Sequence, residues 1–210
     1  MTTSTPRFVL PGTWGRINLA SEAATAKSIR KVLEHVTRRR DDMADTRAQL
    51  RVRFQKAADV AREGGASDFY VAFNLTPKVP LPAWVSVFTP EIGSTDFAAL
   101  GLGDLKSFLD AGTRRWGADD AEIVTSDAPG EGIHAVRHSW RRVVDVVEGE
   151  VEQTFEFVEA DYWLAATDPN RLALLTFSTA LAEYEEEMLG LFDAVVGTIR
   201  WPAPTPEPVA

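Results

Sequence analysis

The sequence predicts a single α/β domain of the α+β type, in which helices pack against a mostly antiparallel sheet. Segments with helical periodicity lie near both ends of the chain, short runs of strand formers lie between turn signals, and a hairpin pattern occupies the middle. A chain of 210 residues with 45% apolar residues can bury a substantial core. We expect residues 1–201 to form one domain and the Pro-rich residues 202–210 to be a disordered tail.

The first third of the chain predicts a strand followed by two helices. Residues 8–19 contain the opening strand, and Ser21 is a suitable N-cap for a helix that runs to about residue 40. A second helix restarts at Asp41 or Asp45 and ends before the pair Gly64-Gly65. Both helical segments carry an apolar stripe, which predicts that they pack on the sheet.

Two further strands are expected at residues 69–75 and 83–88. The linker between them contains a Pro-x-x-Pro spacing, from Pro77 to Pro80, which a polyproline-binding domain could recognise. We favour a stiff loop, because proline cannot donate to a strand ladder. A short helix is expected at residues 104–111.

The C-terminal part predicts a strand, a helix and a final strand. Residues 172–178 are strand formers, and from Ala182 the apolar residues recur at helical spacing, with glutamates crowding the first turns. Gly197 is expected to end this helix in a left-handed conformation. Residues 198–201 then alternate as a last strand.

Both ends of the chain resemble the PsbP-like superfamily. Domains of that superfamily close with an apolar strand, an amphipathic helix containing Phe-Asp and a short strand ending in Trp, which residues 174–178, 191–193 and 198–201 match. The opening segment matches as well, since Pro11 shortly precedes Trp14. The resemblance implies an antiparallel sheet flanked by helices. The superfamily includes a photosystem extrinsic subunit and a Ran-binding release factor, so a non-catalytic binding role is implied too.

The middle of the chain predicts a long hairpin with its turn at Glu148-Gly149. This turn pairs Val147 with Glu150, and His138 then meets Glu159 across the strands. The same register sets Asp145 opposite Glu152, an unfavourable like-charge pair that signals a bulge in the true register.

One face of this hairpin carries the candidate polar site, which consists of His138, Arg142, Glu159 and Asp161. A histidine beside carboxylates and aromatic side chains could support proton transfer. We favour a structural role, since ion pairs at the end of a sheet shift the pKa values of their members without taking part in catalysis. His134 and His138 cannot share a metal, because four residues of strand separate them by roughly 13 Å.

The sequence contains no complete motif for another kind of catalytic or cofactor site. The chain has no cysteine, which excludes disulfides and thiolate chemistry, and it has neither a dinucleotide fingerprint nor a phosphate-binding loop. No serine nucleophile elbow occurs. We therefore assign no catalytic, cofactor-binding or metal-binding residue and expect no cofactor.

The charge pattern favours a protein partner. Residues 22–64 hold 11 basic against 7 acidic residues, whereas residues 145–193 hold 13 acids and the single Arg171, a local net charge of −12. An acidic half suits a partner with a basic surface, and the pattern does not favour nucleic acid. Without a signal-peptide core or an apolar run of spanning length, the chain is expected to be cytoplasmic.

Two functions follow as hypotheses. The first is a non-catalytic protein-interaction or accessory binding module, which the acidic half, the resemblance and the missing catalytic motifs favour. The second is a small-molecule-binding protein or a hydrolytic enzyme that uses His138 and Glu159. An aromatic-lined pocket reaching His138 would favour the second hypothesis.

Overall fold

The computed structural model describes residues 5–37, 44–91, 104, 107, 122–127, 133–148, 151–167 and 170–201. The chain divides into two compact units. We call Leu10–Phe88 the N-terminal unit, and Thr89–Ala210 together with Met1–Val9 the C-terminal unit. The fold is α+β, as predicted: within each unit the described strand pairs are antiparallel and helices pack against them. A single domain over residues 1–201 stays a prediction.

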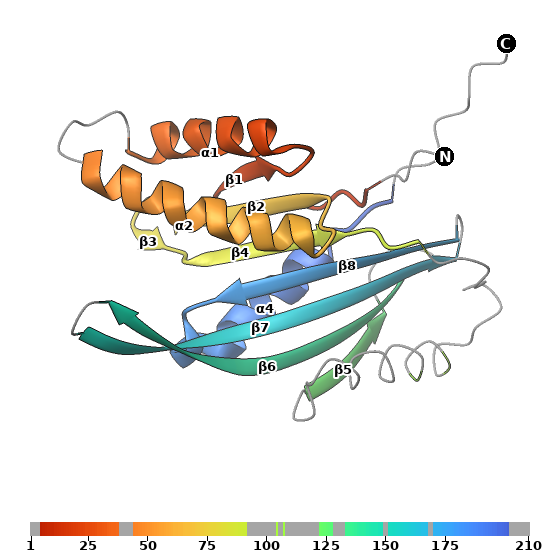
Figure 1. Cartoon of the computed structure of the whole chain (residues 1–210). Coiled ribbons are helices and arrows are strands. Elements are labelled where there is room, and N and C mark those ends of the chain that lie inside the picture. The colour runs from red at the N-terminus through yellow and green to blue at the C-terminus, as the bar shows by residue number, and fades with distance from the viewer. Residues whose placement is uncertain are drawn as a thin grey trace, which may run out of the picture. The chain divides into compact units, whose positions relative to one another are not determined.

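The N-terminal unit consists of a small sheet and two helices (Figure 1). In chain order its elements are β1 (Thr13–Asn18), α1 (Glu22–Thr37), α2 (Ala44–Glu63), β2 (Asp68–Thr76), β3 (Val79–Pro80) and β4 (Ala83–Phe88). Strand β2 lies between β1 and β4. The predicted helices and strands of this unit are confirmed, and Ser21 caps α1 by accepting a 3.2 Å hydrogen bond from the Ala24 amide.

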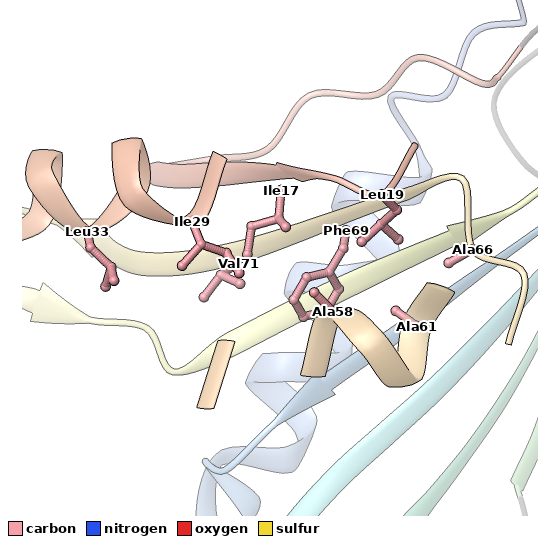
Figure 2. Packing of buried hydrophobic residues seen from close by; sticks show 9 residues of the cluster. All are labelled: Ile17, Leu19, Ile29, Leu33, Ala58, Ala61, Ala66, Phe69 and Val71. Atoms are coloured by element: carbon pink, nitrogen blue, oxygen red, sulfur yellow. The ribbon is translucent and has the colours of Figure 1, made fainter. Parts of the chain in front are cut away.

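The core of the N-terminal unit forms where both helices cover one face of the sheet. Ile17 of β1 lies opposite Phe69 of β2, and both side chains are buried. Figure 2 shows Ile29 of α1 and Ala58 of α2 close to these strand residues. The period of two in the strands and of about 3.6 in the helices brings these apolar residues to one layer.

The linker between β2 and β4 differs from the expected loop. Val79 and Pro80 form the short strand β3, in which Pro80 lies opposite Asn74. Proline is tolerated here because the following Leu81 amide donates instead, to the Phe73 carbonyl at 3.2 Å.

The C-terminal unit contains the longest of the described strands (Figure 1). Its described elements are β5 (Glu122–Asp127), β6 (Ile133–Glu148), β7 (Val151–Thr167), β8 (Asn170–Thr179), a 3-10 turn (Ala182–Tyr184) and α4 (Glu185–Val196). The strands pair in the order β5, β6, β7, β8. At the N-terminus of the chain, Arg7 forms an isolated bridge with Arg200.

Aromatic packing joins α4 to the strands of the C-terminal unit. Phe177 of β8 stacks on Phe192 of α4 with ring centroids 4.6 Å apart, and Tyr162 of β7 meets Phe177 edge-on at 5.4 Å. All three side chains are almost completely buried. Burial of this size typically stabilises a protein by about 2–3 kcal/mol per side chain.

The end of the chain departs from the prediction in two ways. Gly197 is right-handed, with φ −58°, because the amides of Gly197 and Thr198 already satisfy the carbonyls of Asp193 and Val195. Residues 198–201 form no strand: only Arg200 pairs, and it pairs with Arg7. The tail at residues 202–210, and the expected helix at 104–111 apart from Asp104 and Ser107, lie outside the described residues.

Two left-handed glycines in the N-terminal unit allow a matched test of backbone strain. Gly12 and Gly65 have φ of 85° and 84°, but a Cβ on Gly12 would lie 2.2 Å from the Asn74 carbonyl oxygen, whereas a Cβ on Gly65 would meet nothing within 4 Å. We expect Gly65→Ala to lower the free energy of unfolding by about 1–2 kcal/mol, the cost of left-handed backbone. Gly12→Ala should cost at least ~3 kcal/mol. Urea denaturation of both variants measures the difference, and equal losses would contradict the described approach of β1 to β2.

Candidate functional site

The candidate site is built on the pairing of β6 with β7, whose register differs from the predicted one. Glu148 lies opposite Val151, so residues 149 and 150, which are outside the described residues, separate the two strands. The predicted pair of Val147 with Glu150 is therefore wrong. The turn is displaced by one residue, and each residue of β6 meets a partner two positions further along β7 than expected.

The displaced turn removes a repulsive pair. In the predicted register Asp145 would face Glu152, whereas in the structure it lies opposite Thr154. The Thr154 hydroxyl donates a 2.7 Å hydrogen bond to Asp145 Oδ1. A hydrogen bond thus replaces the expected like-charge contact. The expected bulge is absent, because the described pairing of β6 with β7 is continuous.

The two-residue displacement also changes the neighbours of the predicted site residues. His138 lies opposite Asp161, and Trp140 lies opposite Glu159, so the predicted pair of His138 with Glu159 is wrong. Because side chains alternate with a period of two, a displacement by two keeps every residue on its predicted face. The register therefore still brings the four candidate residues to one face of the hairpin.

Glu159 and Arg142 form the ion pair of this face. Arg142 donates to Glu159 Oε1 from Nε at 2.8 Å and from Nη2 at 2.6 Å. Its guanidinium also lies 4.9 Å from the centre of the Phe157 ring. Burial raises the pKa of Glu159 above its usual value, although the hydrogen bonds and charge of Arg142 oppose the increase.

Asp161 is the second perturbed carboxyl group of the site. Its pKa is raised from the usual 3.8 to about 6, mainly by burial and in addition by the nearby Glu159 charge, while a hydrogen bond with Thr176 opposes the increase. Asp161 Oδ1 is buried without a hydrogen-bond partner among the described residues. An acid of this pKa exchanges its proton near neutral pH.

The imidazole of His138 completes the polar layer but is closed to solvent. Its exposed fraction is 0%, and Asp161 is its cross-strand neighbour. A substrate therefore has no surface of His138 to contact in this conformation. Within the described ranges, no group of three or more His, Asp or Glu side chains could hold a metal ion.

The opposite face of the same strands carries a polar cluster that sequence reasoning missed. Asp193 of α4 accepts a 2.8 Å hydrogen bond from the Tyr162 hydroxyl on Oδ1 and a 2.5 Å bond from Arg137 on Oδ2. Burial, together with Asp193, raises the pKa of Tyr162, which keeps the phenol protonated as the donor. Helical spacing from Phe192 could have placed Asp193 at the edge of the apolar stripe.

Arg141 extends this second face towards the tip of the hairpin. It donates from Nε to Glu185 of α4 at 2.6 Å and lies 3.5 Å from Glu156. The contact with Glu156 is diagonal, because Val158 is the direct cross-strand partner of Arg141. The ion pairs therefore fix α4 on the same strands that carry the polar site.

Beyond the polar site the hairpin continues as a two-stranded ribbon. Among the described pairings, β5 pairs with β6 no further than Ser139, and β8 pairs with β7 only from Val158 onwards. We call residues 142–148 of β6 and 151–157 of β7 the ribbon; Figure 1 shows it running past the end of β8. Val143 is 59% exposed and Phe155 is 40% exposed, so the ribbon presents apolar side chains on both faces.

Comparison of the chain with protein-family models, curated proteins and solved structures gives no match. The likeness to the PsbP-like superfamily therefore stays a prediction. Among the described residues, no helix combines the length and the apolar character that crossing a bilayer would need.

The raised pKa of Asp161 predicts how stability depends on pH. Between pH 3.8 and about 6 the folded state holds a proton that the unfolded state has lost, so the contribution of Asp161 to stability falls as pH rises through this window. We expect Asp161→Asn to raise the free energy of unfolding at pH 7 by about 1–3 kcal/mol and to change it little at pH 4. Urea denaturation between pH 4 and 7 measures the gain.

The matched control is Asp145→Asn, which removes one negative charge from an exposed position of the same hairpin. A gain in unfolding free energy for Asp161→Asn that is the same at every pH, or no larger than that of the control, would contradict a raised pKa of Asp161 in the folded protein.

Proposed function

We propose that this protein is a non-catalytic protein-interaction module and that the ribbon is its contact surface. The proposal rests on the exposure of Val143 and Phe155 on a ribbon that extends beyond its described neighbouring strands. A two-stranded ribbon is marginally stable in water by itself. A partner that covers these apolar side chains would stabilise it.

The side chains of the ribbon suit a protein interface. Aromatic residues and arginine are enriched in interface cores, and one face presents Phe155 and Phe157 around Arg142. The neighbouring Trp140 is half-buried and has area left for a partner. The alternation along both strands places these groups on a single face, as a continuous binding surface requires.

Charge indicates the chemistry of the partner. Residues 140–157 contain five acids against two arginines, and those arginines already bind Glu159 and Glu185 within the chain. The field outside the ribbon is therefore negative. A partner with a basic surface around an apolar centre would complement it, and association should depend on ionic strength.

The alternative, a small-molecule-binding or hydrolytic function at His138 and Glu159, has less support. The two residues are not cross-strand partners, Arg142 occupies Glu159, and His138 has an exposed fraction of 0%. The PsbP-like resemblance implies a binding role and agrees with the first function. We keep it as part of this proposal.

Site-specific photocrosslinking in the host cell tests the proposed surface. A photoreactive phenylalanine analogue replaces Phe155 in one sample and Val79 in the control sample, because Val79 is 47% exposed and lies on β3 of the N-terminal unit. We expect position 155 to give an adduct with another protein and position 79 to give none. Equal adducts at both positions, or only adducts between two copies of this chain, would contradict the proposal.

The captured partner then allows a test of charge. Glu156 is an exposed acid on the ribbon, and the matched control Glu187 is an exposed acid on α4. We expect Glu156→Lys to slow association several-fold with little change in dissociation, since rim charges act mainly on the association rate. Glu187→Lys should change it less. Association rates are measured by stopped flow at low and high salt. Rates that depend on neither salt nor the substitution at Glu156 would show that the acids of the ribbon only keep the surface soluble.

A further inference from the structure

We infer that the outer edge of β6 at residues 140–146, where the ribbon begins, pairs antiparallel with the same edge of a second copy of this chain, so that two sheets join across a two-fold axis centred on Val143. The inference rests on the proposed function only in that both use the ribbon as the binding surface. It assigns a particular partner, a second copy, to one edge of that surface.

Among the described strands, the outer side of β6 lacks a partner over a defined length. Strand β7 covers one side of β6 along its whole length, whereas on the other side the described pairing with β5 stops at Ser139. From residue 140 to 148 the outward backbone groups of β6 thus have no strand partner among the described residues. Such an edge is a template for pairing with another strand.

Symmetry restricts how two identical strands can pair. A two-fold axis perpendicular to the sheet sets each residue opposite the residue at the same distance beyond the central position, and opposed side chains share a face. With Val143 at the centre, Arg141 of one copy lies opposite Asp145 of the other, on both sides of the axis. Val143 meets its own counterpart, and Trp140 lies opposite residue 146. The pairing of residues 140–146 fits within the available edge.

Neighbouring registers of the β6 edge match charges less well. Centring the axis on Arg142 places Arg141 opposite Val143, and centring it on Val144 places Asp145 opposite Val143, so neither forms an ion pair next to the axis. Centring it on Asp145 places Arg142 opposite Glu148, but it also sets the Asp145 carboxylate against its own counterpart at the axis. The register centred on Val143 is therefore the favoured one.

The outer edge of β7 offers no equivalent. In the ribbon it has Glu152 and Glu156 but no cation, and an axis centred on Thr154 would bring these two glutamates face to face. Of the two ribbon edges, only the β6 edge is self-complementary in charge.

The side chains at the axis have room for new partners. Arg141 is half-exposed, and beyond its two carboxylate partners its guanidinium has further N–H groups to donate. Asp145 is exposed, and its carboxylate can accept more than the single bond from Thr154. Val143, which is 59% exposed, would be covered by its counterpart. A seven-residue strand pair is a small interface, so we expect dissociation in roughly the micromolar range.

A charge swap tests the register. Sedimentation velocity of the full chain, at concentrations from about 1 to 500 μM, spans the expected dissociation range. The wild type should dimerise. Arg141→Asp sets two aspartates against each other, and Asp145→Arg sets two arginines against each other, so each variant alone should dimerise at least tenfold more weakly. An equimolar mixture should recover the dimer, because in each hybrid the introduced aspartate faces the introduced arginine and the native Arg141 faces the native Asp145.

A cysteine test does not depend on the charged residues. The chain has no cysteine, so Val143→Cys introduces the only thiol, and the two-fold axis brings it next to its counterpart. We expect air oxidation to form a disulfide-linked dimer much faster than in the control Val60→Cys, whose native side chain is 63% exposed on α2. Phe155→Cys, on the other strand of the ribbon, should also react slowly.

The outcomes separate this inference from the proposed function. A wild type that stays monomeric at about 500 μM, a mixture no more dimeric than its folded components, or equal oxidation rates of the Val143→Cys and Val60→Cys variants would overturn the dimer. If either charge variant loses the cooperative thermal transition of the wild type, the oxidation rates of the Val143→Cys and Val60→Cys variants provide the test instead. Photocrosslinking of another protein from position 155 would still support the interaction module if the dimer failed.

Discussion

The antiparallel pairing of β6 with β7 is the constraint on which both polar clusters of the C-terminal unit depend. Its register decides that Asp161, and not Glu159, lies opposite His138, and that Thr154 bonds Asp145. Because alternation assigns successive residues to opposite faces, the same pairing separates the buried acids from the arginines that hold α4.

The two faces of these strands use charge in different ways. On one face Tyr162 and Arg137 converge on Asp193 at the surface of α4, which joins helix to sheet through hydrogen bonds around an aromatic stack. On the other face Asp161 is buried beside Glu159 with a pKa raised to about 6, so its contribution to stability falls as pH rises from 3.8 to about 6. A group that destabilises the fold near neutral pH is a common feature of functional sites, but a structural network can hold one as well. The closure of His138 favours the second explanation.

The ribbon shows a conflict between folding and binding. Where β6 and β7 extend beyond their described neighbours, apolar side chains are exposed and the described pairings leave a strand edge unpaired, both of which folded proteins usually avoid. The acids along the ribbon disfavour those self-registers that set like charges face to face. The same pattern leaves one register of β6 complementary to itself, so protection against aggregation and recognition of a second copy can share one sequence.

The sequence by itself determined the α+β class and most elements, because periodicity and capping are local: α1 begins after Ser21, α2 ends before Gly64-Gly65, and β4 covers residues 83–88 as predicted. It also determined which residues share a face of the hairpin, since displacement by two residues leaves alternation unchanged. The tertiary structure alone decided the partners within that face. Two turns one residue apart are both compatible with the local sequence around Glu148, and their energies differ through contacts along the whole hairpin, such as the one between Thr154 and Asp145. The isolated bridge at Arg200 and the burial of His138 depend likewise on segments distant in the chain, whose contacts no local pattern encodes.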